Sequence, residues 1–341
     1  MFSNIYECIK KILIRNYKFI IFIICFTIIV NYPVPYYIFT SGGITDLSSR
    51  FEIESATVQK GSYNLSYVTE INGTVLTYLM SFIIPNWDLV EVSNYQINSA
   101  ESLEDLAIRD RLSLEIANQS AVKVAYEKAS KKFKINKENL FIVYTDEYLD
   151  STVKIDVGDQ ILSVDNVEVN KFDDLSDYLD KKEVGSKVTL TLKRENQTFT
   201  TDVLVHDING KKSTGIGMYI IYDYEVDPKI KFNFTNNESG SSAGFMTSLA
   251  IYDTLIEEDL TNGLKIAGTG TIDSNGNVGE IGGVEYKLKG AVNEKSDIFF
   301  VPMGNNYDEC LKIKKEKKYD IVIVGISKID DAIEYLENLK N

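Results

Sequence analysis

A turn rich in glycine and serine holds the residues best suited to nucleophilic chemistry. It reads Gly240-Ser241-Ser242-Ala243-Gly244 and leads directly into an apolar, helix-forming stretch. Such a turn places serine hydroxyls beside the free backbone N–H groups of a helix N-terminus, which can stabilise negative charge on an oxyanion. The same residue types also form ordinary helix caps. The turn alone therefore leaves catalysis and capping open.

Histidine, the usual base that activates a serine, is almost absent from the chain. His206 is the only one in 341 residues, and it has no serine or cysteine context that suggests a nucleophile, so we expect it at the surface. One histidine excludes zinc sites built from two or more histidines, and three cysteines exclude a four-thiolate zinc site. The run 273–277 lacks the glycine and glutamate spacing of a calcium loop, and a hairpin turn is expected there. We predict neither a metal nor another cofactor.

The segment after the turn resembles a known family. Residues 242–244 (Ser-Ala-Gly), 268–270 (Gly-Thr-Gly) and 281–283 (Ile-Gly-Gly), with Lys287 four positions after the last glycine, resemble the proteolytic domain of the Lon family of serine peptidases. The order of apolar N-terminus, PDZ-like module and this domain resembles the membrane-anchored PDZ and Lon-like peptidases of the YlbL/SepM type. The resemblance implies that Ser242 is the nucleophile, Lys287 the general base, and Thr269 a hydrogen-bonding neighbour of this dyad.

The turn departs from the family pattern at one position. Ser241 stands where these peptidases have proline, so two adjacent hydroxyls could serve as the nucleophile. Register with Ala243 and Gly244 favours Ser242 and leaves Ser241 as the alternative. Backbone N–H groups around Gly240, Ser241 and Ala243 would then bind the oxyanion.

A lysine can replace histidine as the base only when its amine is neutral. The amine has a pKa of ~10.4 in water, and desolvation lowers this pKa. Lys287 has apolar neighbours, among them Leu288, as such a site requires. Lys265 and Lys289 are the alternatives, and we expect both to be exposed to solvent.

Strands and helices in an α/β arrangement must position these residues. Two strands joined by the Asn275-Gly276 turn are expected between Thr269 and Lys287. Further apolar strands and a helix complete the domain, at 297–302, 319–324 and 329–339. Upstream, the periodicity predicts a helix over 99–132 and strands between 50 and 95, with a turn at 71–75.

Residues 155–195 resemble the second half of a PDZ domain. A Gly-Asp pair at 158–159 should lead into a strand, a short helix is expected around residues 175–179, and a last strand at 187–194. Such domains bind an extended peptide by strand addition. The resemblance places the peptide-binding side chains at Phe141, Ile142, Val143, Leu175 and Leu179. A degraded groove with a purely structural role is the alternative.

The N-terminal segment joins a basic end to a long uncharged run. Residues 1–18 carry four basic residues and one acidic residue, hence +3, whereas residues 19–45 carry none. A membrane-spanning helix needs ~20 apolar residues, and we predict a bilayer anchor within residues 12–39. The positive-inside rule then keeps the N-terminus cytoplasmic and the rest outside the cell membrane. No small-x-small cleavage site follows, which favours an uncleaved anchor over a signal peptide.

Together these features predict a multidomain α/β (α+β) protein with an N-terminal transmembrane helix. The expected parts are a cytoplasmic stub and anchor at 1–40, a strand and helix region at 41–135, a PDZ-like domain at 136–207 and a Lon-like proteolytic domain at 208–341. The net charge of −14, with about −17 outside the basic end, argues against a nucleic-acid partner.

The chain also lacks the Gly-x-x-x-x-Gly-Lys-Ser/Thr motif, so no ATP is expected. The predicted function is an ATP-independent, membrane-anchored serine endopeptidase that cleaves exported peptides or flexible protein segments. The alternative is an inactive PDZ-containing peptide-binding sensor or scaffold. The oligomeric state is left open.

Overall fold

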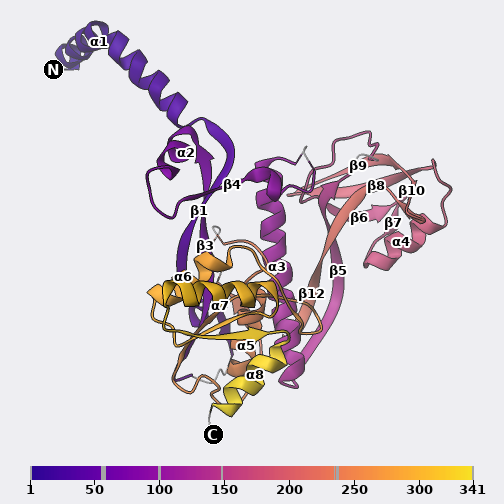
Figure 1. Cartoon of the computed structure of the whole chain (residues 1–341). Coiled ribbons are helices and arrows are strands. Elements are labelled where there is room, and N and C mark those ends of the chain that lie inside the picture. The colour runs from indigo at the N-terminus through magenta and orange to yellow at the C-terminus, as the bar shows by residue number, and fades with distance from the viewer. Residues whose placement is uncertain are drawn as a thin grey trace. The chain divides into compact units, whose positions relative to one another are not determined.

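The computed structural model describes residues 2–54, 59–98, 101–146, 149–233, 235 and 238–339. The chain divides into two units, one made of Met1–Ser41 with Val68–Gln96 and the other of Gly42–Tyr67 with Ile97–Asn341. Figure 1 shows the elements of both. Strands β1 (Pro33–Asp46) and β3 (Ser62–Thr74) each have residues in both units.

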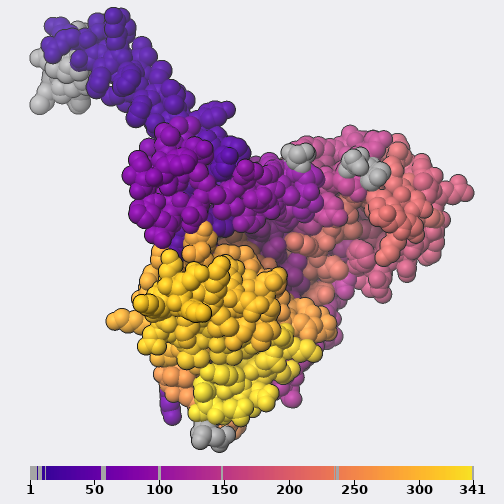
Figure 2. Space-filling view, viewed as in Figure 1, coloured from indigo at the N-terminus to yellow at the C-terminus, as the bar shows by residue number. Residues whose placement is uncertain are grey.

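Helix α1 (Phe2–Val30) opens the first unit and is a candidate membrane span by length and composition. Its window Leu13–Val30 has a mean hydropathy of 2.0 and no buried residue, and Figure 2 shows this helix projecting from the rest of its unit. The helix ends before Pro33, where β1 starts and pairs with β4 (Asp88–Glu91). The predicted bilayer segment was therefore too long, because residues 33–39 form a strand in which Ile38 is fully buried.

The turn predicted at 71–75 is wrong. Strand β3 runs through these positions to Thr74, which caps helix α2 (Val75–Ser81) with a capping box that includes Thr77. Gly73 is required for a different reason: a Cβ atom there would lie 2.3 Å from the carbonyl oxygen of Tyr36. The glycine thus permits close approach of two strands rather than a reversal of the chain. A short 3₁₀ helix, η2 (Val92–Asn94), follows β4.

A parallel sheet forms the centre of the C-terminal part of the second unit. Strand β14 (Lys265–Gly268) pairs in parallel with β3 on one side and with β17 (Ile298–Pro302) on the other, and β17 pairs in parallel with β18 (Val322–Ile326). Alternate side chains of β17 enter two different cores, because successive residues of a strand face opposite sides of a sheet. The sheet is therefore buried on both faces, as parallel sheets require.

Helices cover these two faces. The core on one side includes residues of α5 (Gly244–Leu255) and α8 (Ile329–Asn338), and the core on the other includes residues of α6 (Val284–Asn293) and α7 (Asn305–Lys317). The Asn-Gly turn joins β15 (Thr271–Ile272) to β16 (Val278–Gly279), as predicted. Two short strands, β2 (Phe51–Ile53) and β13 (Ile230–Phe232), pair beside the 3₁₀ helix η1 (Leu47–Ser49).

A second sheet, largely antiparallel, lies earlier in the chain. Its order is β12-β5-β6-β8-β9, with β7 beside β6. The bounds are β5 (Lys132–Thr145), β6 (Gln160–Val164), β7 (Val167–Glu168), β8 (Lys187–Arg194), β9 (Gln197–Leu204) and β12 (Ile216–Asp227). Helix α4 (Phe172–Asp180) adds Leu175 and Leu179 to its core. A hairpin of β10 (His206–Ile208) and β11 (Lys211–Ser213) precedes β12.

Helix α3 (Leu103–Lys128) contacts both sheet regions. The helix begins later than the predicted range 99–132, because Ser102 caps its N-terminus in a capping box with Asp105. One side of α3 packs along α5, and Gln119 reaches β12, where its Nε2 donates to the carbonyl oxygen of Ile220 (2.8 Å) and its Oε1 accepts from the N–H of Tyr222 (2.7 Å). The side-chain amide thus forms hydrogen bonds with backbone groups of β12, an edge strand of this sheet.

Candidate active site

The glycine-serine turn is held at both ends by backbone hydrogen bonds. The N–H of Gly240 donates to the carbonyl oxygen of Asp110 on α3 (2.9 Å), and Gly240 adopts a φ of +86° that favours glycine. The carbonyl oxygen of Ser242 accepts from the N–H of Gly270 (2.9 Å) and from the hydroxyl of Thr269 (3.3 Å). Ala243 then caps α5. The serine is therefore fixed between α3 and the end of β14.

Lys287 lies beside this turn in the first part of α6. The helix starts after Gly283, which has a left-handed φ of +67°. From this position the Nζ of Lys287 donates to the Oγ of Ser242 (3.0 Å) and to the Oγ1 of Thr269 (3.2 Å). Lys287 is 4% exposed and Thr269 is fully buried. Three side chains far apart in the sequence thus meet through their polar atoms.

Burial controls the charge of this lysine. Desolvation lowers the pKa of Lys287 from 10.5 to about 8, because the charged ammonium loses water. The neighbours that replace water are hydroxyl groups, which do not supply a compensating negative charge. Burial therefore shifts this amine toward its neutral form.

The alternative lysines and the second serine have other surroundings. Lys265 donates from Nζ to the carbonyl oxygen of Glu294 (2.6 Å), and Lys289 is half-exposed. The carbonyl oxygen of Ser241 accepts from the N–H of Gly244 (3.2 Å) in a tight turn. Within the described ranges, the N–H groups of Ser241, Ser242 and Ala243 donate to no backbone acceptor, so they can serve an incoming oxygen.

Family models match two parts of the chain. A PDZ domain model matches residues 149–205, and a model of the Lon protease (S16) C-terminal proteolytic domain matches residues 235–338. The chain contains a PDZ domain and a Lon-type proteolytic domain. The match to the Lon-type domain spans Ser242, Thr269 and Lys287, and a Lon-type domain supports a peptidase activity.

Solved structures also resemble the PDZ domain. The PDZ domain of an SdrC-like protein from Listeria monocytogenes is 20% identical, covers 25% of this chain and 92% of its own, and has a TM-score of 0.22. The PDZ domain of an SdrC-like protein from Listeria innocua is 21% identical, with 24% and 93% coverage and a TM-score of 0.21. No curated protein matches the chain significantly.

Strand β5, which precedes the matched PDZ residues and pairs with their strand β6, has little room for an added peptide. Ile142, Leu175 and Leu179 belong to the buried core of this sheet, Val143 is buried outside that core, and Phe141 is half-buried. One edge of β5 pairs with β12 along its length, and the other pairs with β6 and with the loop before it, where the N–H of Ile142 donates to the carbonyl oxygen of Asp159 (2.8 Å). At 140–142 both edges are occupied, so strand addition at the predicted residues would require displacement of β12 or β6.

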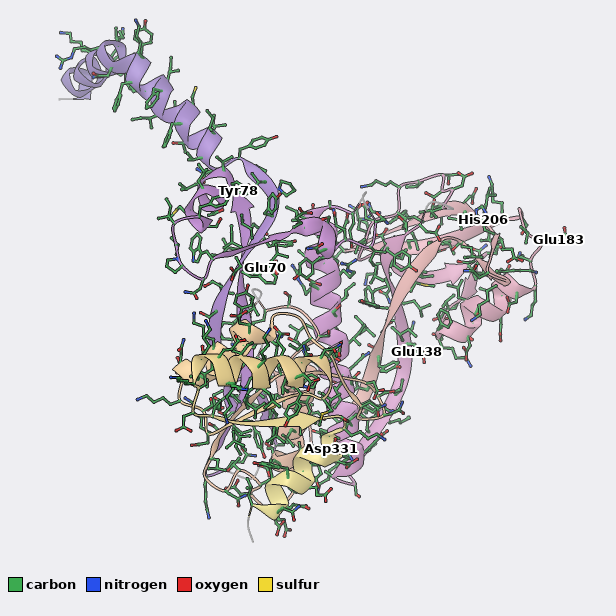
Figure 3. All side chains as sticks on the ribbon, in the orientation of Figure 1. Glu70, Tyr78, Glu138, Glu183, His206 and Asp331 are labelled. Atoms are coloured by element: carbon green, nitrogen blue, oxygen red, sulfur yellow. The ribbon has the colours of Figure 1, made fainter. Side chains whose placement is uncertain are left out.

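His206 lies in the β10–β11 hairpin next to the PDZ domain, paired with Ser213. Figure 3 labels it there, well away from Asp331 in α8 of the Lon-type domain. The histidine lies in the two-stranded β10–β11 sheet, whereas Thr269 follows β14 and Lys287 lies on α6, so the site is built without imidazole.

Two groups that hold the serine turn were missed by the sequence reasoning. The carbonyl oxygen of Asp110 has no sequence signature, because any residue supplies a backbone carbonyl. Gly270 did carry a signal in the Gly-Thr-Gly run: a Cβ atom there would lie 2.8 Å from Val278 and 3.2 Å from Phe245. Only glycine brings this backbone N–H so close to α5 and to the serine.

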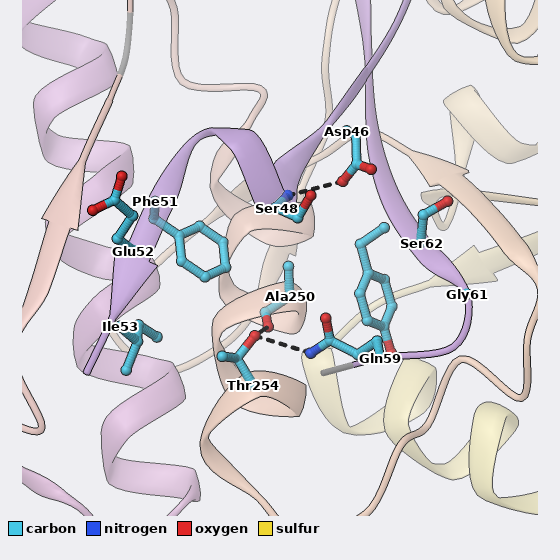
Figure 4. Close-up of a pocket in the computed structure, with 11 residues that line it drawn as sticks. Asp46, Ser48, Phe51, Glu52, Ile53, Gln59, Gly61, Ser62, Ala250 and Thr254 are labelled. Atoms are coloured by element: carbon cyan, nitrogen blue, oxygen red, sulfur yellow. Dashed lines mark hydrogen bonds between the residues drawn. The ribbon is translucent and has the colours of Figure 1, made fainter. Parts of the chain in front are cut away.

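A separate cavity of 520 Å³ lies along α5, away from the serine turn (Figure 4). Its walls combine Phe51 and Tyr63 with polar groups such as Thr254, to which Gln59 Nε2 donates (3.0 Å). None of the predicted site residues lines it.

Proposed function

We propose that the chain is a membrane-anchored serine endopeptidase in which Ser242 is the nucleophile and Lys287 the general base. The observation that supports this best is the buried Lys287 amine, 3.0 Å from the Ser242 hydroxyl oxygen. This is the contact that activation of a serine by a neighbouring base requires. The α1 helix supplies the anchor, and the basic N-terminal end keeps that end cytoplasmic.

The reaction follows from these positions. The neutral amine of Lys287 accepts the Ser242 proton as Oγ bonds to the substrate carbonyl carbon, and the carbonyl oxygen becomes an oxyanion. Backbone N–H groups at Ser242 and Ala243 stabilise this oxyanion at the start of α5. Lys287 then returns the proton to the leaving amine, which frees the new N-terminus and leaves an acyl-serine. Water activated by the same amine hydrolyses this ester and restores Ser242.

Thr269 positions both partners. Its hydroxyl donates to the Ser242 carbonyl oxygen and accepts from the Lys287 amine, so it ties the backbone of the nucleophile to the base. The PDZ domain in the same chain favours a peptide or flexible protein segment as the substrate. We expect cleavage outside the cytoplasmic membrane and without ATP.

The test uses the full chain in detergent micelles and a fluorescently labelled unstructured polypeptide, without nucleotide. Ser242→Ala and Lys287→Ala should each remove cleavage, since each deletes one half of the dyad. Ser241→Ala and Lys289→Ala are the matched controls and should retain it. If Ser241→Ala abolishes cleavage and Ser242→Ala spares it, the nucleophile is misassigned. Equal rates for wild type and the dyad variants would instead favour the inactive scaffold.

A further inference from the structure

The first unit exposes an unusual apolar surface on α2. Phe82 and Ile83 are 69% and 79% exposed, the two highest values for large apolar side chains among the described residues outside α1. Leu76 and Leu79 are 44% and 57% exposed on α2, whereas Phe82 is the C-cap of this helix and Ile83 follows it. These four residues are called the α2 surface below. A soluble protein rarely leaves such a cluster facing water, so it marks an interaction site.

The α2 surface is held in place by the aromatic contacts of Tyr78. Tyr78 packs against Tyr36 of β1 and against Phe82, with ring centroids 5.3 Å apart in both pairs. Figure 3 labels Tyr78 at this position. The capping box at Thr74 fixes the start of the helix. The apolar side chains therefore project from an ordered element.

The α2 surface adjoins the end of the candidate span. The N–H of Val75, the first residue of α2, donates to the carbonyl oxygen of Tyr32 (3.0 Å), two positions after α1 ends at Val30. Helices α1 and α2 are in contact within their unit. The α2 surface therefore lies next to the end of α1, whose largely apolar segment Leu13–Val30 is itself not buried.

The amino-acid composition around the α2 surface favours lipid over protein as its partner. Residues 71–87 contain no charged side chain and end at Trp87, the only tryptophan of the chain. Tyrosine and tryptophan next to a span are typical of the membrane–water boundary, where their rings meet both acyl chains and headgroups. A protein partner would be expected to meet a polar, charged rim around the apolar residues.

We propose that the α2 surface inserts into the boundary between headgroups and acyl chains of the leaflet where α1 ends. This inference rests on the membrane anchoring proposed above and is independent of the peptidase activity. Apolar side chains on a surface helix bind this boundary by burying area that would otherwise face water. The chain is thus attached to the bilayer at two adjacent places, a span and a surface helix.

The single tryptophan provides the test. The full chain with Trp87→Phe is reconstituted into phosphatidylcholine and phosphatidylglycerol vesicles, and one tryptophan is introduced by Phe82→Trp on the α2 surface. Vesicles with lipids brominated near the headgroup should quench its emission strongly and shift it to shorter wavelength. Val184→Trp is the matched control, because Val184 is 56% exposed in the PDZ domain and should keep its full emission.

A further probe, Phe22→Trp in α1, measured in vesicles whose lipids are brominated deep in the acyl chains, separates this inference from the anchoring itself. Quenching of Phe22→Trp without quenching of Phe82→Trp overturns the α2 proposal and leaves the anchor intact. Absence of quenching at both positions overturns the anchor as well. The emission of Phe82→Trp could instead be unquenched by brominated lipid yet shift in wavelength as the protein-to-lipid ratio rises. This result would mean that the surface binds a second copy of the chain, and the proposal would again be wrong.

Discussion

Two buried ionisable side chains, one in each domain of the second unit, have opposite kinds of partner: one has an opposite charge and the other has only neutral groups. Asp159 in the PDZ domain is 1% exposed and Lys287 in the Lon-type domain is 4% exposed. Arg194 grips Asp159 with two contacts of 2.7 Å, from Nε to Oδ1 and from Nη2 to Oδ2, and the N–H of Asp156 donates to its Oδ2 (2.9 Å). Lys287 has two hydroxyl partners.

The difference separates a structural charge from a reactive one. Arg194 and a backbone N–H occupy both carboxylate oxygens of Asp159, which makes this side chain a fixed part of the fold. The hydroxyls around Lys287 satisfy hydrogen bonds without neutralising a positive charge, so desolvation lowers its pKa to about 8. Burial without a counter-charge is the condition under which a side chain can exchange a proton during a reaction.

The largest expected effect on activity comes from replacing Lys287 by a residue that stays positively charged. Lys287→Arg keeps a positive charge and hydrogen-bond donors but cannot deprotonate near neutral pH. If the amine acts as a base, kcat/KM for peptide cleavage should fall by about a thousandfold, within the range for loss of a general base. Lys289→Arg, two positions along the same helix, should leave the rate unchanged. A Lys287→Arg enzyme with near wild-type kcat/KM would mean that the lysine acts only through its charge.

The pH dependence should reveal the same group. Because the base must be neutral, kcat/KM should rise about tenfold per pH unit below the pKa of Lys287, about 8, and level off above it. The rate profile is measured on wild type, with circular dichroism at each pH to verify folding. A profile that is flat between pH 6 and 9 would contradict a lysine base. A profile that falls as pH rises would require a protonated lysine.

Asp159→Asn removes the negative charge that pairs with Arg194. The substitution leaves Arg194, which is 39% exposed, with only Asp156 as an acidic partner, and stability of the PDZ domain should fall by about 2 kcal/mol. Hydrogen exchange of the β6 and β8 amides measures this in the full chain. Asp156→Asn is the control: Asp156 is 31% exposed and should contribute less than about 1 kcal/mol. The comparison fails if the two substitutions destabilise equally, or if Asp159→Asn lowers kcat as Lys287→Arg does.

Sequence reasoning reached the site because its side chains lie within local motifs. Ser242, Thr269 and Lys287 are each marked by neighbouring glycines that the backbone needs, such as Gly270 beside Phe245. The Asn-Gly turn also followed from local chemistry alone. The resemblance to Lon-type domains then connected segments that local patterns could not.

The errors arose where distant segments meet. Gly73 was interpreted as a turn residue, yet it is small because Tyr36 lies against it. The pairing of β5 with both β6 and β12 around Ile142 could not be predicted either, because β12 lies far along the chain. Pairing between remote strands has no local signature, and neither has the backbone carbonyl of Asp110 that holds Gly240.

The smallest expected effect tests whether hydroxyl partners tune the unpaired lysine. Thr269→Val removes a hydroxyl that accepts from the Lys287 amine, and loss of an acceptor disfavours the charged ammonium. The midpoint of the pH–rate profile should therefore move down by about half a unit, since one hydrogen bond contributes about 1 kcal/mol or less here. The plateau rate should fall about fivefold, because the Ser242 carbonyl oxygen also loses a donor.

Thr269→Ser keeps the hydroxyl and serves as the rescue variant, with a midpoint and plateau close to wild type. A purely structural role for Thr269 predicts lower activity at every pH with an unchanged midpoint. An upward shift of the midpoint in Thr269→Val would show that the threonine disfavours the ammonium. The lysine would then owe its lowered pKa to its hydroxyl neighbours as well as to burial, and the contrast with Asp159 would rest on the choice of partner rather than on desolvation alone.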